Sequence, residues 1–361
     1  SHYPNFKNKN LVQKDLANTL KIIASEGKKG FYEGEIAEKI SKEITENNGL
    51  ISKSDLKKYN PIWRDPLISN YRDTKVITMG PPSSGGLHVI QMLNILENYD
   101  LNKIGHNSSE YINLLAEVMK YAYADRSKYL GDPDFYEVPI NKITSKEYAN
   151  EINKNIEIGK LRPANQILPG KFMRKESHET THFSVVDKQG NVVSMTYTLN
   201  STFGSKVVIE GTGILMNNEM DDFSAAPGVP NQFNLLGAEA NEIAPFKRPL
   251  SSMTPTIVLK NDELFFTTGS PGGARIISAV LQSILNIIDF NMNLEDTTLA
   301  KRIHHQWYPD ILEYEFSLDK IIENDLKKIG YKTSSKLPLT SLQTIMFADG
   351  IYYGYGDFRR V

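Results

Sequence analysis

The chain has 361 residues, of which 40% are hydrophobic and 23% charged, and its formal net charge is −2 at pH 7. This composition is typical of a globular protein with one large or two medium cores, and it gives no sign of a basic surface for nucleic acid or acidic membranes. The sequence contains no cysteine, which excludes disulfides, thiolate catalysis and thiolate metal sites. No apolar run approaches the length of a membrane span, and the polar first ten residues do not have the pattern of a signal peptide.

The first part of the chain is predicted to be mainly helical. Hydrophobic residues three or four positions apart predict helices over residues 16–27 and 36–48. Ser52 with Asp55 resembles a helix-capping signal, and Asp65-Pro66 is read as a break. Four further elements are expected, namely a strand over 75–79, a tight loop over 81–86 and helices over 87–97 and 109–129.

Residues 151–179 are predicted to form an exposed, mobile linker, because this stretch is polar, charged and interrupted by two prolines. After the linker, alternating hydrophobic residues predict strands. The expected elements are strands over 182–187, 192–199, 256–259 and 263–267 and a helix over 275–289. Helices followed by antiparallel strands indicate an α+β fold with helices packed on stacked sheets.

The junction between the linker and the first of these strands is the informative place for chemistry. Thr180 stands there, and a threonine hydroxyl is a weak nucleophile until a base removes its proton. A free α-amino group on the same residue, with a pKa of about 7.7–8.0, can be that base. This solution requires cleavage of the Glu179–Thr180 bond. By itself, however, Thr-Thr-His is typical of an ordinary strand start.

Long blocks of sequence around Thr180 favour a nucleophile over an ordinary strand start. The run TTHFSVVDKQGNVVSMTYTLNSTFGS, residues 180–205, resembles the start of the small subunit of γ-glutamyltransferases. Further matching blocks follow in the family's order, namely NNEMDDFS (217–224), PGVPN (227–231), KRPLSSMTPTIV (247–258), GSPGGARII (269–277) and HHQW (304–307). Upstream, LVQKDLANTL, PPSSGG and YAYADRSKYLGDPDF resemble the later part of the family's large subunit. The resemblance covers nearly the whole chain.

The resemblance implies a fold and a maturation step. The fold would be the four-layer αββα sandwich of the N-terminal-nucleophile hydrolases, in the α+β class. Self-cleavage at Glu179–Thr180 would give residues 1–179 as the later part of a large subunit and 180–361 as the small subunit, and the two would stay associated. No metal or organic cofactor is implied.

The resemblance also assigns catalytic roles. Thr180 would be the nucleophile of both self-cleavage and catalysis, and Thr198 would orient its hydroxyl. Gly272 and Gly273 would offer main-chain N–H groups to the oxyanion, which suits a glycine turn at the start of a helix. From local pattern alone, Thr198 is an ordinary strand residue and Gly272-Gly273 an ordinary turn.

The γ-glutamyl group carries an ammonium and a carboxylate, so its site needs both charges. By resemblance, three residues would face the ammonium, Asn200, Glu219 and Asp222, while Ser251 and Ser252 would donate to the carboxylate. Read without the resemblance, these are loop polar residues. The family's carboxylate-binding arginine comes from the early part of the large subunit, which is not expected within this sequence. No such role is assigned to Arg126, Arg248 or Arg275.

Two further features of the sequence bear on the function. Residues 227–238 resemble a loop that covers the pocket in bacterial transferases, with Phe233 as the gate where relatives often carry tyrosine. This loop favours a glutathione-type transferase over the related cephalosporin acylases, which tend to lack it. The adjacent histidines His304 and His305 favour a structural role over a metal site, because neighbouring side chains on a strand or helix point apart.

The implied reaction is attack of Thr180 on the γ-glutamyl amide of glutathione or a related compound, followed by transfer to water, an amino acid or a peptide. No nucleic-acid partner is expected, and the family implies a periplasmic or secreted location. Three alternatives stay open. The chain could be an acylase for another amide, such as poly-γ-glutamate or a glutaryl side chain. It could be an inert uncleaved precursor or binding module, or two subunits written as one chain.

Overall fold

The structure is a computed structural model that describes residues 11–168, 181–226, 229, 231–232, 235–338 and 340–360. The chain groups into two compact units, one from residues 1–64 and 203–218 and the other from 65–202 and 219–361. Thr180, Phe233 and residues 169–179 of the predicted linker lie outside the described residues. Every other predicted site residue belongs to the second unit. The first part of that linker is described, and the prediction that it is exposed is wrong at Ile152, Ala164 and Ile167, whose side chains are buried by packing into the core.

The first unit is a small helical assembly. Its helices are α1 (Lys14–Glu26), α2 (Lys28–Tyr32), α3 (Glu35–Glu46) and α4 (Lys53–Lys58), with the short strands β5 (Val208–Ile209) and β6 (Ile214–Leu215). Ile36, Ile40 and Ile209 form its buried centre. The predicted capping signal is confirmed, because the Asp55 carboxylate accepts from the Ser52 N–H at 2.8 Å while Ser52 Oγ accepts from the Asp55 N–H.

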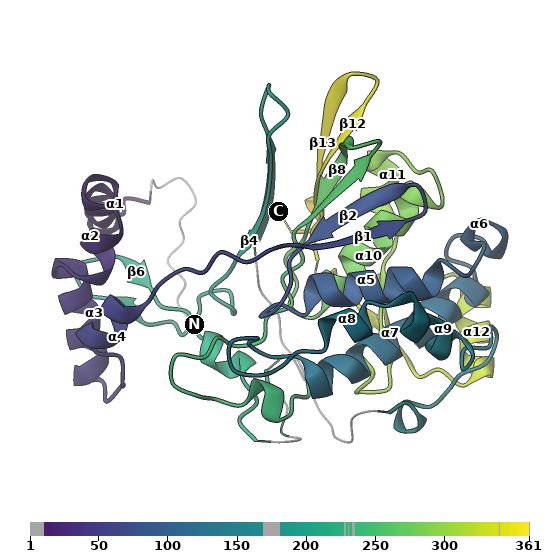
Figure 1. Cartoon of the computed structure of the whole chain (residues 1–361), viewed down its shortest axis with the longest axis horizontal. Coiled ribbons are helices and arrows are strands. Elements are labelled where there is room, and N and C mark those ends of the chain that lie inside the picture. Colours follow the sequence, from purple (N-terminus) through teal and green to yellow (C-terminus); the bar gives the residue numbers. More distant parts are fainter. Residues whose placement is uncertain are drawn as a thin grey trace. The chain divides into compact units, whose positions relative to one another are not determined.

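A six-stranded antiparallel sheet forms the centre of the second unit (Figure 1). Its strands, in spatial order, are β1 (Leu67–Tyr71), β2 (Thr74–Thr78), β7 (Thr256–Lys260), β8 (Glu263–Thr268), β12 (Gln343–Ala348) and β13 (Ile351–Gly356). β2, which precedes the predicted cleavage point, pairs along its whole length with β7, which follows it. The predicted subunit boundary is therefore not a spatial boundary within this sheet.

Helices cover one face of the sheet (Figure 1). The long ones are α5 (Gly85–Leu96), α7 (Ser109–Tyr129) and α10 (Arg275–Ile288). Their apolar side chains share one core with Val258 and Phe266 of the sheet. α7 is buried on all sides from Tyr111 to Ser127, and not only along the face predicted from its hydrophobic spacing. It therefore runs through the interior of the unit.

Shorter elements complete this unit. They are α6 (Leu101–Ile104), α8 (Ile140–Ile143), α9 (Lys146–Asn153), α11 (Leu294–Leu299), α12 (Lys320–Ile329), the strands β9 (Ile303–His304), β10 (Leu312–Glu315) and β11 (Thr333–Lys336), and the 3-10 turns η1 (Ala164–Gln166), η2 (Glu219–Asp222), η3 (Glu239–Asn241) and η4 (Phe358–Arg360). β9, β10 and β11 form a three-stranded sheet. None of the helices in the described ranges is long and apolar enough to cross a membrane.

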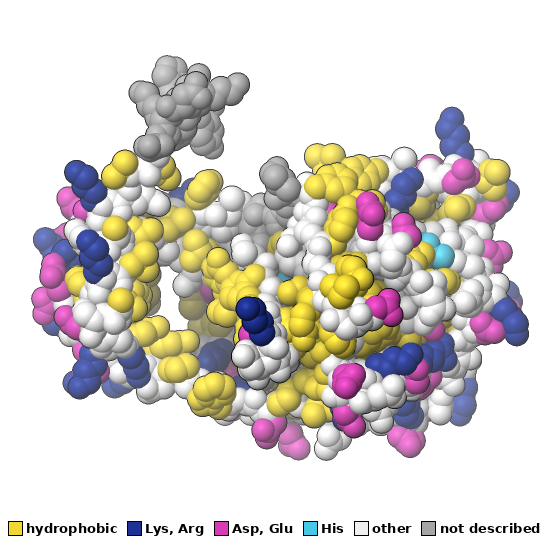
Figure 2. Space-filling view, turned by 90° about the horizontal axis from the view of Figure 1, so that it is seen from above, with side chains coloured by type: hydrophobic (Ala, Val, Ile, Leu, Met, Phe, Trp, Pro, Cys, Tyr) yellow, Lys and Arg dark blue, Asp and Glu magenta, His cyan; other side chains and the backbone are white. Residues whose placement is uncertain are grey.

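A second sheet lies on the other face of the six-stranded sheet. It is the hairpin of β3 (Thr181–Val186) and β4 (Val192–Tyr197), which contacts β12, β7 and β8. The Ser184 and Ser194 side chains point inward and bond main-chain groups of the large sheet. The hairpin's outer face is apolar and exposed, and hydrophobic side chains are plentiful on the surface drawn in Figure 2. Its exposed members are Phe183, Val185, Val193, Met195 and Tyr197. A strand pair with apolar residues outward is typical of a layer that is covered on both sides.

The α+β class and the stacked sheets are confirmed, as are the predicted strands and helices between residues 14 and 288 that fall in the described ranges. β1 was not predicted, because Asp65-Pro66 was read as a break, yet the strand begins directly after the proline, at Leu67.

Candidate active site

One pocket of the second unit collects most of the predicted site residues. Thr198, Asn200, Asp222, Ser251, Ser252 and Gly273 line it together with Arg126. These residues come from the segment after β4, from η2, from the segment before β7, from the turn before α10 and, for Arg126, from α7. Glu219 lies on η2 with Asp222, and Gly272 precedes Gly273. Residues far apart in the sequence therefore form one site.

The acidic side of the pocket is built by η2. The Glu219 and Asp222 carboxyl groups hydrogen-bond each other, and Asn200 Nδ2 donates to Asp222 Oδ1 at 3.3 Å. Burial raises the pKa of both carboxyl groups, and the nearby Glu219 charge raises the pKa of Asp222 further. Two buried carboxyl groups in contact cannot both ionise cheaply, so this corner favours a proton or a bound cation.

The backbone around this corner is held locally. Asn241 Nδ2 donates to the main-chain carbonyl of Asp222 at 2.7 Å, which fixes the turn. Asn200 adopts a φ of +72°, a left-handed conformation that asparagine tolerates better than most residues, and its N–H donates to Thr198 Oγ1 at 2.8 Å. The Thr198 hydroxyl oxygen is thereby fixed in place at the end of β4.

The opposite side of the pocket is a hydroxyl cluster organised by a buried arginine. Arg126 Nε donates to Ser84 Oγ at 2.9 Å, and its Nη2 donates to Ser252 Oγ at 3.2 Å. Ser84 Oγ in turn donates to the main-chain carbonyl of Ser251 at 2.8 Å. The guanidinium also lowers the pKa of Asp222, although burial outweighs this effect. The pocket thus has a cationic, hydroxyl-rich side and an acidic side.

The glycines lie at the start of α10. Gly272 has a φ of +136° and Gly273 a φ of +55°, conformations that glycine adopts without strain. The turn is held by a hydrogen bond from Tyr123 Oη to the carbonyl of Ala274 at 2.6 Å and by one from the Ser341 N–H to Ser270 Oγ at 2.9 Å. A rigid glycine turn at a helix N-terminus can place N–H groups toward a developing negative charge.

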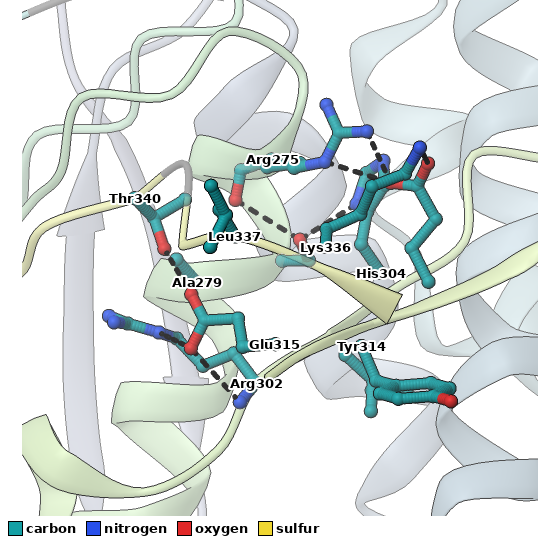
Figure 3. A pocket seen from close by; sticks show the side chains of 12 residues that line it. Arg275, Ala279, Arg302, His304, Tyr314, Glu315, Lys336, Leu337 and Thr340 are labelled. Carbon is teal, nitrogen blue, oxygen red and sulfur yellow. Dashed lines mark hydrogen bonds and ion pairs between the residues drawn. The ribbon is translucent and has the colours of Figure 1, made fainter. Parts of the chain in front are cut away.

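A different pocket lies beside α10, with Arg275, Glu313, Arg302 and Glu315 among its lining residues (Figure 3). Its charges are satisfied within the protein, because Arg275 Nε bonds Glu313 at 2.9 Å and Arg302 Nε bonds Glu315 at 3.2 Å. Arg248, the third arginine left unassigned, has its guanidinium 3.8 Å from the Asp134 carboxylate. Of the three arginines, Arg126 is the one that lines the predicted site.

The residues that the structure describes contain no group of three or more His, Asp or Glu side chains arranged to hold a metal ion. His305 Nε2 lies 3.2 Å from Asp310 Oδ1, and its Nδ1 accepts from the Trp307 N–H. His304 Nδ1 lies 2.9 Å from Ser278 Oγ. Both histidines therefore have packing partners on the protein.

The comparisons with known proteins agree with this geometry. Residues 5–361 match the family described as Gamma-glutamyltranspeptidase, and the chain belongs to that family. It is 50% identical over 356 residues to the glutathione hydrolase proenzyme of Escherichia coli (strain K12), and this match covers 98% of this chain and 61% of that protein. It is 42% identical over 361 residues to the glutathione hydrolase proenzyme of Pseudomonas sp. (strain A14), and this match covers 97% of this chain and 63% of that protein.

Among solved structures, cephalosporin acylase from Bacillus halodurans matches with a TM-score of 0.81 at 27% identity, covering 96% of this chain and 61% of that chain. The fold is therefore that of the N-terminal-nucleophile hydrolases, as predicted. In the second unit, the described residues supply one helical layer and two facing sheets. The chain spans about three fifths of the length of these relatives.

Three residues of the pocket and its supports were missed by sequence reasoning: Ser84, Arg126 and Asn241. The first two lie in PPSSGG and YAYADRSKYLGDPDF, blocks that carry the family resemblance. The family resemblance marked these two segments, but it assigned no role to Ser84 or Arg126. Asn241 lies in none of the matching blocks and had no signal.

Proposed function

We propose that the protein is a γ-glutamyltransferase and glutathione hydrolase. The observation that carries this proposal is the division of one pocket into a buried acidic side, at Glu219 and Asp222, and a hydroxyl side organised by Arg126. An α-amino acid head group has a cation and an anion on one carbon. A bound ammonium would replace the proton that the acidic pair retains, and hydroxyl donors would receive the carboxylate.

The proposed chemistry begins at Thr180. After cleavage of the Glu179–Thr180 bond, the free α-amine would take the proton of the Thr180 hydroxyl, and the oxygen would attack the γ-glutamyl carbonyl carbon. Thr198 would hold the attacking hydroxyl, and the N–H groups of Gly272 and Gly273 would stabilise the oxyanion. The proton passes to the leaving amine, which departs as an ester forms. Water, an amino acid or a peptide then takes the acyl group and restores the threonine.

Two observations support the maturation part of the proposal. Both relatives named above are called proenzymes. The two predicted subunits would also share the six-stranded sheet through β2 and β7, so they would stay together after the cut. We further propose a periplasmic or secreted location and a lid over residues 227–238 gated by Phe233, both from the family resemblance.

An acylase is the second candidate, and the similarity to cephalosporin acylase favours keeping it. The two functions differ in the group that the acidic pair receives, because a glutaryl side chain has no ammonium. A γ-glutamyl anilide and a glutaryl anilide differ only in that group. We expect turnover of the first and little of the second, and we expect Asp222→Asn to remove this preference.

The test of the mechanism uses the full-length protein, its Thr180→Ala variant and, as a control, Thr181→Ala, which removes the neighbouring hydroxyl. We expect two fragments on a denaturing gel for the wild type and the control, with a new N-terminus Thr-Thr-His-Phe in the wild type. We expect γ-glutamyl anilide turnover only in those two proteins. Cleavage and activity in Thr180→Ala would overturn the mechanism, and an inactive, uncut wild type would favour the inert-precursor alternative.

A further inference from the structure

A buried histidine on β3 packs against the segment that leads to the glycine turn of the site. His182 is the second residue of β3, only 4% of it is exposed, and its ring lies against Gly269. A Cβ added at Gly269 would come within 2.1 Å of the ring atom Cε1, so position 269 has room only for glycine. Gly269 opens the segment that leads through Ser270 and Pro271 to Gly272 and Gly273.

His182 belongs to a chain of hydrogen bonds in which each group donates to the next. Gln343 donates its N–H to the carbonyl of Gly269 at 3.0 Å, and Ser184 Oγ donates to the carbonyl of Gln343 at 3.1 Å. Ser184 has thereby used its hydrogen, so its oxygen accepts from His182 Nε2, 3.2 Å away. The ring then carries its proton on Nε2, and Nδ1 accepts from Thr196 Oγ1 at 2.8 Å.

The electrostatics fit this assignment. Burial lowers the pKa of His182 to about 4, so the ring is neutral at physiological pH and has one donor and one acceptor. The chain joins β4, β3 and β12 to the first residue of the glycine turn. Because the ring also fills the space beside Gly269, any shift of His182 changes both the packing and the hydrogen bonding of that turn.

We propose that His182 is a positioning residue, which sets the glycine turn and its N–H groups in register with β3, the strand that the Thr180 nucleophile precedes. This inference rests on the proposed function, since it concerns the same site. Its effect is on the geometry of the oxyanion donors relative to the attacking oxygen. That geometry matters for the transition state more than for binding of the substrate.

The test compares His182→Leu with His182→Gln, whose side-chain amide can still donate toward Ser184. Turnover is expressed per cleaved chain, from band densities on a gel. For His182→Leu we expect kcat to fall about 10- to 100-fold while KM changes by less than about threefold. For His182→Gln we expect kcat within about fivefold of the wild type, because the donor is restored.

A smaller change keeps the test decisive if His182→Leu folds poorly. Ser184→Ala leaves the ring and its packing in place but removes the next link, and we expect a kcat loss at an unchanged thermal midpoint. Equal losses for His182→Leu and His182→Gln, a loss carried by KM, or an unaffected Ser184→Ala would each overturn the inference. An inactive wild type would instead overturn the proposed function, so the two failures are distinct.

Discussion

The indole N–H of Trp307 donates to the main-chain carbonyl of Ala164 at 2.9 Å, although the two residues are 143 positions apart. Asp310 Oδ2 accepts from the Ala164 N–H at 2.9 Å. One residue inside the predicted linker is thus held on both main-chain groups by side chains from beyond the predicted cleavage point. These contacts would keep the end of the large subunit docked after maturation.

Buried side chains of α7 bind the main chain of the residues that precede Ala164. Asn113 bonds the N–H of Gly159 and the carbonyl of Lys160, at 2.7 and 2.9 Å. The buried Lys120 ammonium bonds the carbonyl of Arg162 and pairs with Glu117. Since a buried main-chain group that loses its partner is costly, the whole arm over residues 159–167 is expected to be well protected.

Because the sequence predicts an exposed linker around Lys171, Arg174 and Lys175, trypsin should trim the large subunit of the cleaved wild type there but not at the docked Lys160. Arg162 is not a trypsin site, because Pro163 follows it. Trp307→Phe keeps an aromatic ring and removes the donor, which costs about 1–3 kcal/mol and should speed cutting at Lys160 by about tenfold or more. Fragment masses over a digestion time course give the measurement.

The control for this digestion is Trp63→Phe, which changes the chain's other tryptophan, a fully exposed one. It should leave the trypsin pattern unchanged. Cutting at Lys160 in the wild type, at the same rate as at Lys171, would show that the arm is not docked.

The buried arginine of the site gives a second prediction. Arg126→Lys keeps the charge but cannot bond Ser84 and Ser252 together, because an ammonium lacks the planar fork of a guanidinium. We expect kcat/KM for a γ-glutamyl anilide to fall about tenfold or more. Arg248→Lys is the matched control, since Arg248 lies outside the pocket lining. Equal activity of the two variants would contradict a role for Arg126 in the site.

The raised carboxyl pKa values give a prediction about pH. A folded carboxyl group with a raised pKa holds a proton that the unfolded chain has already lost, so the free energy of unfolding falls as pH rises from the ordinary carboxyl range toward the raised pKa. Asp222→Asn removes one of the two charges. In the ligand-free protein it should raise the thermal midpoint at pH 8, by about 2–4 °C for each kcal/mol of repulsion removed, and have little effect at pH 5.

Thermal unfolding at both pH values measures this difference, with Asp221→Asn as the control. Asp221 lies on the same turn but is exposed, so its substitution should act alike at both pH values. A stabilisation by Asp222→Asn that is the same at pH 5 and pH 8 would show that the pair does not titrate as described.

Tyr123 gives a prediction about the glycine turn. Tyr123→Phe removes the donor to the buried carbonyl of Ala274 and should lower the free energy of unfolding by about 1–3 kcal/mol. Tyr355→Phe, which loses a surface hydrogen bond to Glu295, should cost less than about 0.5 kcal/mol. Urea unfolding compares the two. A cost for Tyr123→Phe no larger than for Tyr355→Phe would mean that the turn is held by other contacts.

Much of the fold follows from local pattern. Alternating hydrophobic residues located β3, β4, β7 and β8, and helical spacing located α7 and α10. The same patterns could not say which way the hairpin faces. Its polar side chains turn inward to main-chain groups of the large sheet, whereas hydrophobic residues are ordinarily expected inside.

The candidate site was found in a different way. Asp222, Ser251 and Gly273 were assigned from the family's sequence blocks, since local pattern alone predicts loop polar residues and a turn. Arg126 shows the limit of that approach. In the sequence it is an ordinary basic residue in the last turn of a helix, and its role depends on Ser84 and Ser252, which are 42 and 126 positions away.

The sequence by itself determined the family and many of the helices and strands, because residue order and hydrophobic spacing carry those directly, and it predicted the junction at Thr180. Only the tertiary structure decided that Glu219 and Asp222 share a buried corner, that Arg126 organises the facing hydroxyls and that His182 lies beneath Gly269. The physical reason is that burial and side-chain contact depend on segments brought together by packing. Charge, proton position and hydrogen-bond direction are set by those neighbours and not by neighbours in the chain.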